Sequence, residues 1–453
     1  MSNATPSSHQ QPVSPREIQR RQFLATSAGA LAASSLAGRL SAAPDKRRPR
    51  VAVVFTVFTY RSHAHVLLEN FLQPFYFNGQ VTDPGVDVVS FYGDQFPDPE
   101  MSRQVSKDYN IPIYDSIDKA LCCGGKEMAV DAVLSIGEHG SYPRTKLGQT
   151  MYPRKRFFDE IVTVMKRSKK FVPLFNDKHL SYRWDWAKEM YDVTQQYNIP
   201  FLAGSSVPLA QRKPALELPA GKIIREAVSI HGGPVESYDF HGLELLQSMV
   251  EARRGGEAGV SQIQFFDSQQ VKENVTKGYW SQELVNQAMK AELGYVPRDL
   301  AHIKGEDKIE PHAIQVTYRD GWKGTVLRVG KDSTRWNFAC QMKGESSPRA
   351  SAFYVGPWEN RNLFKALSHA IQVHFRTGQA PYPAERTLLV TGMLEAAMRA
   401  RESKLRILKT PHLEFGYQPK DFRALREMGE SWKLITEETP QPPGFENGTP
   451  KSR

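Results

Sequence analysis

Cysteine is scarce in this chain, with only three among 453 residues. Cys122 and Cys123 are adjacent, and Cys340 stands alone. This pattern excludes a disulfide framework and the paired C-x-x-C spacing of structural zinc sites. Beyond the N-terminal region the chain also lacks an uninterrupted apolar run of about 18 residues, so we expect no membrane-spanning helix and a soluble mature protein.

Acidic residues are outnumbered, because 59 Lys and Arg stand against 49 Asp and Glu and give a formal net charge of +10. Such a surplus raises nucleic acid or an anionic membrane surface as a partner. The basic residues are scattered, however, and their runs at 154–156 and 166–170 flank one predicted helix. Because no basic stripe with interleaved aromatic residues is present, we expect no nucleic-acid partner.

The first 43 residues are predicted to be an export signal that precedes the fold. Residues 1–15 are rich in Ser, Gln and Pro and are predicted to be disordered. Arg20 and Arg21 stand before Phe23 and a mild run of Ala and Ser, which is typical of a twin-arginine signal. An amphipathic N-terminal helix is the alternative. The signal implies a bacterial protein that the twin-arginine translocase passes, already folded, to the periplasm.

Residues 48–208 alternate short apolar runs with helical patterns. The strand-like runs are RVAVVF at 50–55, VDVVSFYGD at 86–94, VDAVLSIGEHG at 130–140, KFVPLFND at 170–177 and IPFLAG at 199–204. Strands that alternate with helices at this spacing favour a doubly wound, parallel sheet. We therefore predict a Rossmann-like α/β domain, in which ligands bind at the carboxyl ends of the strands.

From about residue 221 the pattern changes to alternating apolar and polar residues. The strand-like runs, most of them bounded by glycine, are HAIQVTYRDG, GTVLRVG, TRWNFACQMKG and RASAFYVGP. They predict an open, largely antiparallel sheet in an α+β domain over 220–420, which two long amphipathic helical patterns close. Residues 437–453 are rich in Pro and Gly and are predicted to form a disordered tail.

Three local motifs carry a resemblance to a known family. One is IPIYDSIDKAL at 111–121, followed by VDAVLSI, and a second is the R-T-G-x-x-P-x-P pattern within 374–383. The third, FVPLFNDKHLS at 171–181, stands where that family has a Glu-Lys-Pro motif. The sequence resembles the Gfo/Idh/MocA oxidoreductases in these motifs and in the order of its elements. The resemblance implies an NAD(P)-dependent oxidoreductase for a sugar or polyol-like substrate, with copies associating through the open sheet.

The stretch after the first predicted strand departs from that family, because residues 56–63 contain no glycine. A G-x-G-x-x-G turn normally lets the cofactor's pyrophosphate approach a helix N-terminus. Either NAD or NADP binds differently, with help from Thr56 and Arg61, or it does not bind. Asp94 ends the second strand, where dinucleotide enzymes place an acid that binds the ribose, although a simple turn explains it equally well.

Candidate catalytic residues follow two neighbouring strands of the predicted parallel sheet. Asp177-Lys178-His179 replaces Glu-Lys-Pro, so the resemblance implies that Lys178 polarises the substrate oxygen beside the acid Asp177. A lysine in an ordinary exposed loop is the alternative. Glu138 and His139 end the preceding strand and should face the same crevice, where a neutral histidine serves in acid–base chemistry or in contacts to the cofactor.

A second candidate group lies near the start of the second domain. The family carries an Asp and, four residues later, a His as a proton-transfer pair, and His241 fits the histidine. Ser237 occupies the position of the acid, so the flanking Glu236 and Asp239 are candidate substitutes. A cofactor-free or metal-assisted binding protein or hydrolase on the same scaffold is the alternative function. Its divalent-metal ligands would come from a set that matches no standard spacing: His63, His65, His139, His179, His241, Glu138 and Asp177.

Overall fold

The structure is a computed structural model that describes residues 47–403, 405–436 and 438–446. The predicted twin-arginine signal at residues 1–43 lies outside these residues. The described residues from Arg48 onward form a single compact unit, in which two large β-sheets are accompanied by a small two-stranded one. No helix within the described ranges is long and apolar enough to cross a membrane.

The first sheet has six parallel strands, as predicted. In spatial order these are β5 (Ile113–Tyr114), β4 (Asp87–Gly93), β1 (Arg50–Phe55), β6 (Ala132–Ile136), β7 (Leu174–Asp177) and β8 (Phe201–Gly204). The order reverses between β1 and β6, which creates a crevice at the carboxyl ends of these two strands. The Rossmann-like prediction is therefore confirmed.

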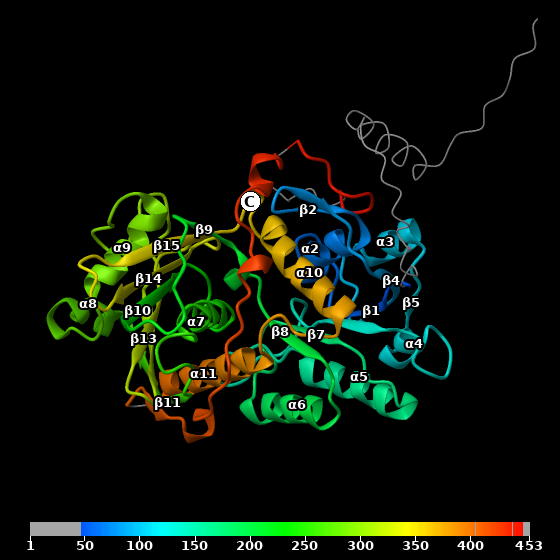
Figure 1. The fold of residues 1–453 in the computed structure, drawn as a ribbon, viewed down its shortest axis with the longest axis horizontal. Coiled ribbons are helices and arrows are strands. Elements are labelled where there is room, and N and C mark those ends of the chain that lie inside the picture. Colours follow the sequence, from blue (N-terminus) through cyan, green and yellow to red (C-terminus); the bar gives the residue numbers. More distant parts are fainter. Residues whose placement is uncertain (1–46, 404, 437, 447–453) are drawn as a thin grey trace, which may run out of the picture. The chain divides into compact units, whose positions relative to one another are not determined.

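Helices cover both faces of this sheet, because alternate residues of each strand point to opposite sides. Val51 and Val53 belong to one core and Val54 to another, and all three are fully buried. Burial of each such side chain contributes about 1.5–3 kcal/mol. Figure 1 shows one set of helices below the sheet and another above it. The lower set is α4 (Ile117–Cys122), α5 (Arg154–Ser168) and α6 (Trp184–Gln196), and the upper set includes α2 (His63–Leu72), α3 (Ser102–Tyr109) and α10 (Asn360–Thr377).

The second sheet has eight strands and is largely antiparallel, as predicted. Only β10 and β13 pair in parallel among its described neighbours. In spatial order the strands are β16 (Ile407–Lys409), β11 (Val260–Phe266), β12 (His312–Tyr318), β13 (Lys323–Arg328), β10 (Ile224–His231), β14 (Trp336–Met342), β15 (Arg349–Tyr354) and β9 (Gln211–Lys213).

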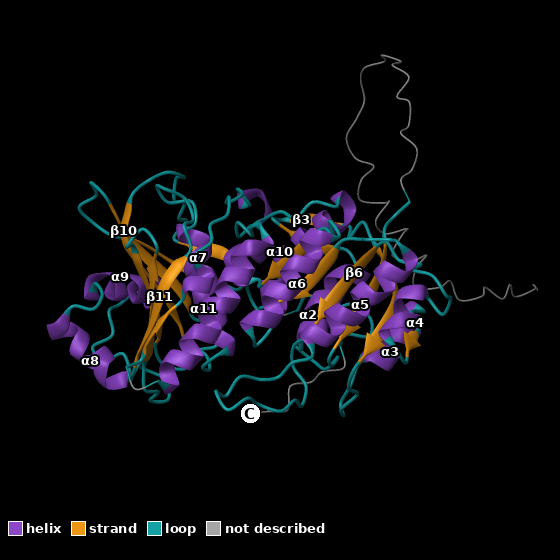
Figure 2. Cartoon of the chain, turned by 90° about the horizontal axis from the view of Figure 1, so that it is seen from below, coloured by secondary structure: helices purple, strands orange, loops and turns teal. Residues whose placement is uncertain are grey.

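Helices also lie on both faces of the second sheet. Figure 2 shows α7 (Ser237–Val250) and α11 (Ala384–Glu402) between the two sheets, with α8 (Ser268–Lys277) and α9 (Gln282–Leu293) on the far side. Helix α8, which begins with a capping box between Asp267 and Gln270, was not predicted from the sequence. Association of copies through this sheet stays a prediction, and in the structure both of its faces carry helices.

Two further features were absent from the sequence predictions. The remaining short elements are β2 (Phe75–Phe77), β3 (Gln80–Thr82) and four 3₁₀ turns at Val207–Leu209, Pro411–Leu413, Arg423–Leu425 and Ser431–Lys433.

Residues 438–446, part of the predicted disordered tail, pack against the first half of the molecule. Phe445 is fully buried and contacts the rings of Phe58, His65 and Tyr109. For this stretch the disorder prediction is corrected, because one large aromatic side chain anchors it.

Candidate functional site

A cavity of about 310 Å³ lies at the carboxyl ends of β1, β6 and β7, where the first sheet faces α7, β14 and α10. Parallel strands end at the same edge of a sheet, so residues far apart in the sequence meet there. Both halves of the chain contribute to the wall. The wall includes His63, His139, Lys178, Tyr238, His241, Trp336 and Phe364.

The backbone around this cavity is strained. Arg61, His139, Lys178 and Glu359 line it and have φ angles of 59°, 69°, 59° and 52°. Non-glycine residues avoid this region because the side chain approaches the backbone, and such positions cost about 1–3 kcal/mol each. Strain of this kind concentrates at functional sites, which supports a functional role for the cavity.

Lys178 reaches the cavity from the end of β7 and pairs with Glu138. Its Nζ donates to Oε1 of Glu138 at 3.0 Å, and Arg154 donates to the other carboxylate oxygen. Burial favours the neutral acid, but the charges of Lys178 and Arg154 outweigh it and hold the pKa of Glu138 well below its ordinary value. Glu138 therefore stays ionised and fixes the lysine ammonium at the cavity wall.

Two further side chains extend this buried group. Nε2 of His179 lies 3.0 Å from Nη1 of Arg154 and 3.7 Å from Oε1 of Glu236. Burial and the charge of Arg154 lower the pKa of His179 well below its usual value, so this ring is neutral and accepts. Burial and the nearby Glu138 raise the pKa of Glu236 to about 7. We call Glu138, Arg154, Lys178, His179 and Glu236 the Glu138 network.

His63, the first residue of α2, pairs with Asp177 at the end of β7. Nδ1 of His63 lies 2.5 Å from Oδ2 of the fully buried Asp177. The ring packs against Phe364 at 4.6 Å and against His139 at 5.0 Å between centroids. A carboxylate bound to one ring nitrogen orients an imidazole for proton transfer at the other nitrogen. From the sequence, His63 was a candidate only in the metal alternative, and its pairing with Asp177 was not predicted.

His139 and His241 supply two more imidazoles to the wall. Burial and the neighbouring His63 lower the pKa of His139 to about 4, and its Nδ1 accepts the backbone N–H of His63 at 3.4 Å. His241 lies in the first turns of α7, 5.1 Å from the ring of Trp336. Burial and Lys178 lower the pKa of His241 far below its usual value. Both rings are therefore neutral at pH 7, and neutral imidazoles accept protons.

Known structures share this arrangement of two sheets, whereas no protein-family model and no curated sequence matches the chain. GenD2 from gentamicin A biosynthesis, solved with NAD, is 11% identical, with a TM-score of 0.51 over 80% of this chain and 96% of its own. A myo-inositol dehydrogenase from Lactobacillus casei, solved with NAD(H) and myo-inositol, is 14% identical, with a TM-score of 0.50 over 83% and 99%. The arrangement of the two sheets in this chain is that of the Gfo/Idh/MocA fold. At these identities the likeness establishes the fold alone.

In the Gfo/Idh/MocA fold the pyrophosphate of a dinucleotide lies against the turn after β1. In this chain residues of that turn are buried and hydrogen-bonded to other parts of the chain. Phe58 is buried, and its carbonyl accepts the N–H of Met101 at 2.8 Å. Thr56 is also buried, and its hydroxyl donates to the carbonyl of Glu138 at 2.5 Å. Arg61 instead lies at the cavity rim, where it pairs with Glu359 at 3.0 Å. Neither Thr56 nor Arg61 is placed to hold a phosphate at this turn.

The N-terminus of α2 has little capacity left for a phosphate. Ser62 accepts the N–H of His65 through its hydroxyl, and His139 accepts the N–H of His63 through its ring. Two of the first three helical N–H groups are thus satisfied by the chain itself. Anion binding at a helix N-terminus requires these groups to be available.

The carboxylate of Asp94, the predicted ribose ligand, is also bound by other residues of the chain. It accepts the hydroxyls of Tyr92 at 2.9 Å and Tyr142 at 2.7 Å, and it pairs with Arg156. Next to it, Gln95 exchanges two hydrogen bonds of 2.9 Å with the backbone of Ser141. These two hydrogen bonds hold the loop after β6 against the end of β4. The residues present do not fit a dinucleotide in the position that the fold provides for it.

Asp239, predicted as a catalytic acid, does not line the cavity. It is fully buried, and Nε2 of His231 and of His312 lie 3.0 Å and 2.7 Å from its Oδ1. Its other oxygen accepts the N–H of Glu236 at 2.8 Å. Although burial opposes ionisation, His312 and His231 hold the pKa of Asp239 far below its ordinary value. The prediction of a proton-transfer role is corrected, because these groups occupy the carboxylate.

Neither the predicted metal set nor the group around Asp239 favours a cation. In the predicted set, a ring nitrogen of each of three histidines already has a partner within hydrogen-bonding distance. The partner of His63 is Asp177, that of His179 is Arg154, and that of His65 is the carbonyl of Phe445. His231, Asp239 and His312 do place three potential ligand atoms within 4.8 Å of one another. The residue paired with both histidines in the sheet register is Arg328, whose positive charge opposes a cation there.

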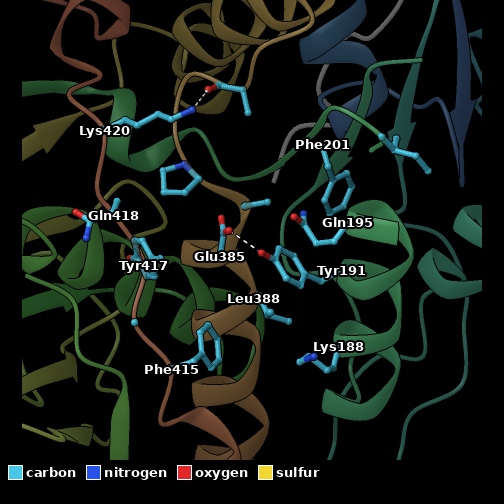
Figure 3. Close-up of a pocket in the computed structure, with 15 residues that line it drawn as sticks. Lys188, Tyr191, Gln195, Phe201, Glu385, Leu388, Phe415, Tyr417, Gln418 and Lys420 are labelled. Carbon is cyan, nitrogen blue, oxygen red and sulfur yellow. Dashed lines mark hydrogen bonds between the residues drawn. The ribbon is translucent and has the colours of Figure 1, made fainter. Parts of the chain in front are cut away.

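A second cavity, of about 580 Å³, lies elsewhere, between α6, α11 and the segment after Phe415. Figure 3 shows Tyr191 and Glu385 pointing toward each other across it, joined by a hydrogen bond of 2.6 Å. Phe201, at the start of β8, forms part of its wall, so this cavity is at the opposite end of that strand from the imidazoles. None of the predicted site residues lines it.

Proposed function

We propose that the chain is an enzyme that binds a polyhydroxylated small molecule, of sugar or polyol type, in the 310 Å³ cavity and transfers protons on it. The observation that carries the proposal is the convergence of the Asp177–His63 pair, Lys178 and His241 on one cavity from both halves of the chain. A cavity that combines apolar walls with a few charged or hydrogen-bonding groups is typical of small-molecule sites.

Each group has a separate task in this proposal. The Lys178 ammonium, held by Glu138, donates to the substrate oxygen on which negative charge develops. His63, oriented by Asp177, exchanges a proton through its second nitrogen, while the neutral His241 accepts one from the other half of the chain. The rings of Tyr238 and Trp336 offer apolar faces against which a sugar or polyol carbon skeleton packs.

Binding tests the proposal directly. Isothermal titration of the purified chain with myo-inositol, D-glucose and D-fructose is expected to identify a ligand, and Lys178→Met is expected to weaken its binding by about tenfold or more. Lys188→Ala is the matched control, because Lys188 lines the second cavity. Absence of binding by every member of this panel contradicts the proposal.

An NAD(P)-dependent oxidoreductase is the second candidate. The observation that favours it is the fold, since GenD2 and the Lactobacillus casei enzyme were solved with NAD or NAD(H). Two observations argue against it. Phe58 is buried in the turn after β1, and Asp94 already binds Tyr142 and Arg156. Titration with NAD⁺ and NADP⁺, with mass spectrometry of the purified chain for retained dinucleotide, separates the two candidates. Binding of either dinucleotide favours the oxidoreductase.

Export to the periplasm is a further proposal, and it rests on the sequence alone. Arg20 and Arg21 support passage through the twin-arginine translocase. Replacing both by lysine is expected to retain the chain in the cytoplasm of its host. Fractionation of cells that express the two forms checks this, and equal export of both contradicts it.

A further inference from the structure

Groups for proton transfer meet at this site, whereas the positions that the fold provides for the pyrophosphate and the ribose of a dinucleotide are occupied by the chain's own atoms. His139 accepts the N–H of His63 at the start of α2, Tyr142 and Arg156 bind Asp94, and Phe58 is buried in the turn after β1. A dehydrogenase needs both parts, because the proton leaves a hydroxyl while hydride leaves the carbon. A site with only the first part is suited to reactions that move protons alone.

Those groups match the requirements for removing a proton from a carbon next to a carbonyl. As a base takes the proton, the C–H electron pair forms a C=C bond and the carbonyl π pair moves to oxygen. The Lys178 ammonium lies at the cavity wall to donate to that oxygen. No oxidant or reductant enters, and the proton returns to the same carbon or to the former carbonyl carbon.

Two bases are available for the two proton transfers. His63 comes from α2 and is oriented by Asp177, and His241 comes from α7 with its Nδ1 lacking a hydrogen-bond partner among the described residues. The base that takes the proton becomes an imidazolium, exchanges that proton with the solvent and returns one to the carbon skeleton. Return to the same face of the carbon is exchange alone, and return to the opposite face is an epimerisation. Return at the former carbonyl carbon is an isomerisation, in which the neighbouring hydroxyl loses its proton and the former carbonyl oxygen gains one.

We propose that this site, without a dinucleotide, exchanges protons at the carbon next to the carbonyl of a ketose or keto-polyol. The inference rests on the proposed function and narrows its substrate to one that already carries a carbonyl. The class of reaction that must supply such a substrate is the oxidation of a sugar or polyol hydroxyl. The chain thus follows a dehydrogenation that it does not itself perform.

Deuterium exchange tests this inference. The purified full-length chain is incubated with D-fructose or with the keto-inositol myo-inosose in ²H₂O, and ¹H NMR follows the signal of the hydrogen next to the carbonyl. We expect the signal to disappear without added dinucleotide, and Lys178→Met and His63→Gln each to slow the exchange by about 10²-fold or more. Lys188→Ala should exchange at the wild-type rate, and thermal unfolding confirms that the variants fold.

The possible results distinguish this inference from the proposed function. Exchange by the wild-type chain that the two site variants lose supports both. Binding of a polyhydroxylated ligand without exchange of either keto probe overturns the inference and leaves the proposed binding site intact. Exchange or oxidation that appears only after NAD⁺ or NADP⁺ is added overturns the inference in favour of the oxidoreductase. Absence of binding by every ligand overturns the proposed function itself.

Discussion

The Nδ1 atom of His63 lies 2.5 Å from the Oδ2 atom of Asp177, so the start of α2 is joined to the end of β7. Asp177 is fully buried, and His63 is exposed only at the cavity. The carboxylate thus selects one tautomer of the ring and leaves its second nitrogen available at the cavity. Lys178, the residue after Asp177, lines the same cavity, so one strand end supplies both the orienting acid and the cation.

Asp177→Asn is expected to keep the shape of this pair and to disturb the tautomer of His63. Proton exchange should fall by about 10³-fold, as expected when an orienting carboxylate becomes an amide. The rate of α-proton exchange and the melting temperature are measured together. A variant that melts as wild type and exchanges at the wild-type rate shows that the pair is structural.

Glu138→Gln is expected to destabilise the fold by about 3 kcal/mol, because it leaves two buried cations without their shared carboxylate. The pKa of Glu138 is held below its ordinary 4.5, so its contribution is complete above that pH and is lost as the pH falls further. Urea unfolding should therefore show that the free energy of unfolding decreases more for wild type than for the variant when the pH is lowered from 7 to 4. Glu160→Gln, in an exposed pair with Arg156, is the control and should change stability by less than about 1 kcal/mol.

His139 is expected to be neutral at pH 6, where an ordinary histidine is largely charged. Its pKa is lowered to about 4 by burial and by the neighbouring His63. A histidine with a lowered pKa takes up its proton more readily when unfolded, so its effect is to reduce stability as the pH falls from 6.5 toward 4. Imidazole ¹⁵N NMR checks the ring directly, and a midpoint near 6.5 contradicts the described environment.

Phe445→Ala is expected to cost about 3–5 kcal/mol, the usual effect of truncating a fully buried phenylalanine. The loss should release residues 438–446 from Phe58, His65 and Tyr109. Limited proteolysis and denaturant unfolding provide the measurement, with Val275→Ala as control because Val275 is 76% exposed. Equal protease resistance of Phe445→Ala and wild type contradicts the packing.

The sequence was sufficient for the first sheet because its central strands, such as β1 and β6, are buried on both faces and read as continuous apolar runs. β1 over Arg50–Phe55 coincides with the predicted strand, and β7 ends at Asp177 as expected. Parallel strands end at a common edge, so the placement of Lys178 and His139 beside each other followed from the strand order.

Pairings across long separations could not be predicted in the same way. His63 and Asp177 are 114 residues apart, and nothing local in either sequence indicates the contact. Asp239 was inferred from its proximity to His241, but successive helical positions point in different directions, and the turn of α7 carries Asp239 toward His231 and His312. The burial of Phe445 depends on a pocket formed by residues more than 300 positions earlier.

The binding of a keto-polyol to the wild-type chain and to Lys178→Met, followed by isothermal titration in the absence of dinucleotide, tests the central claim most directly. The account predicts that wild type binds myo-inosose or D-fructose without NAD⁺ or NADP⁺ and that the variant binds at least about tenfold more weakly while remaining folded. Equal affinity of the two chains, or binding only after a dinucleotide is added, contradicts it.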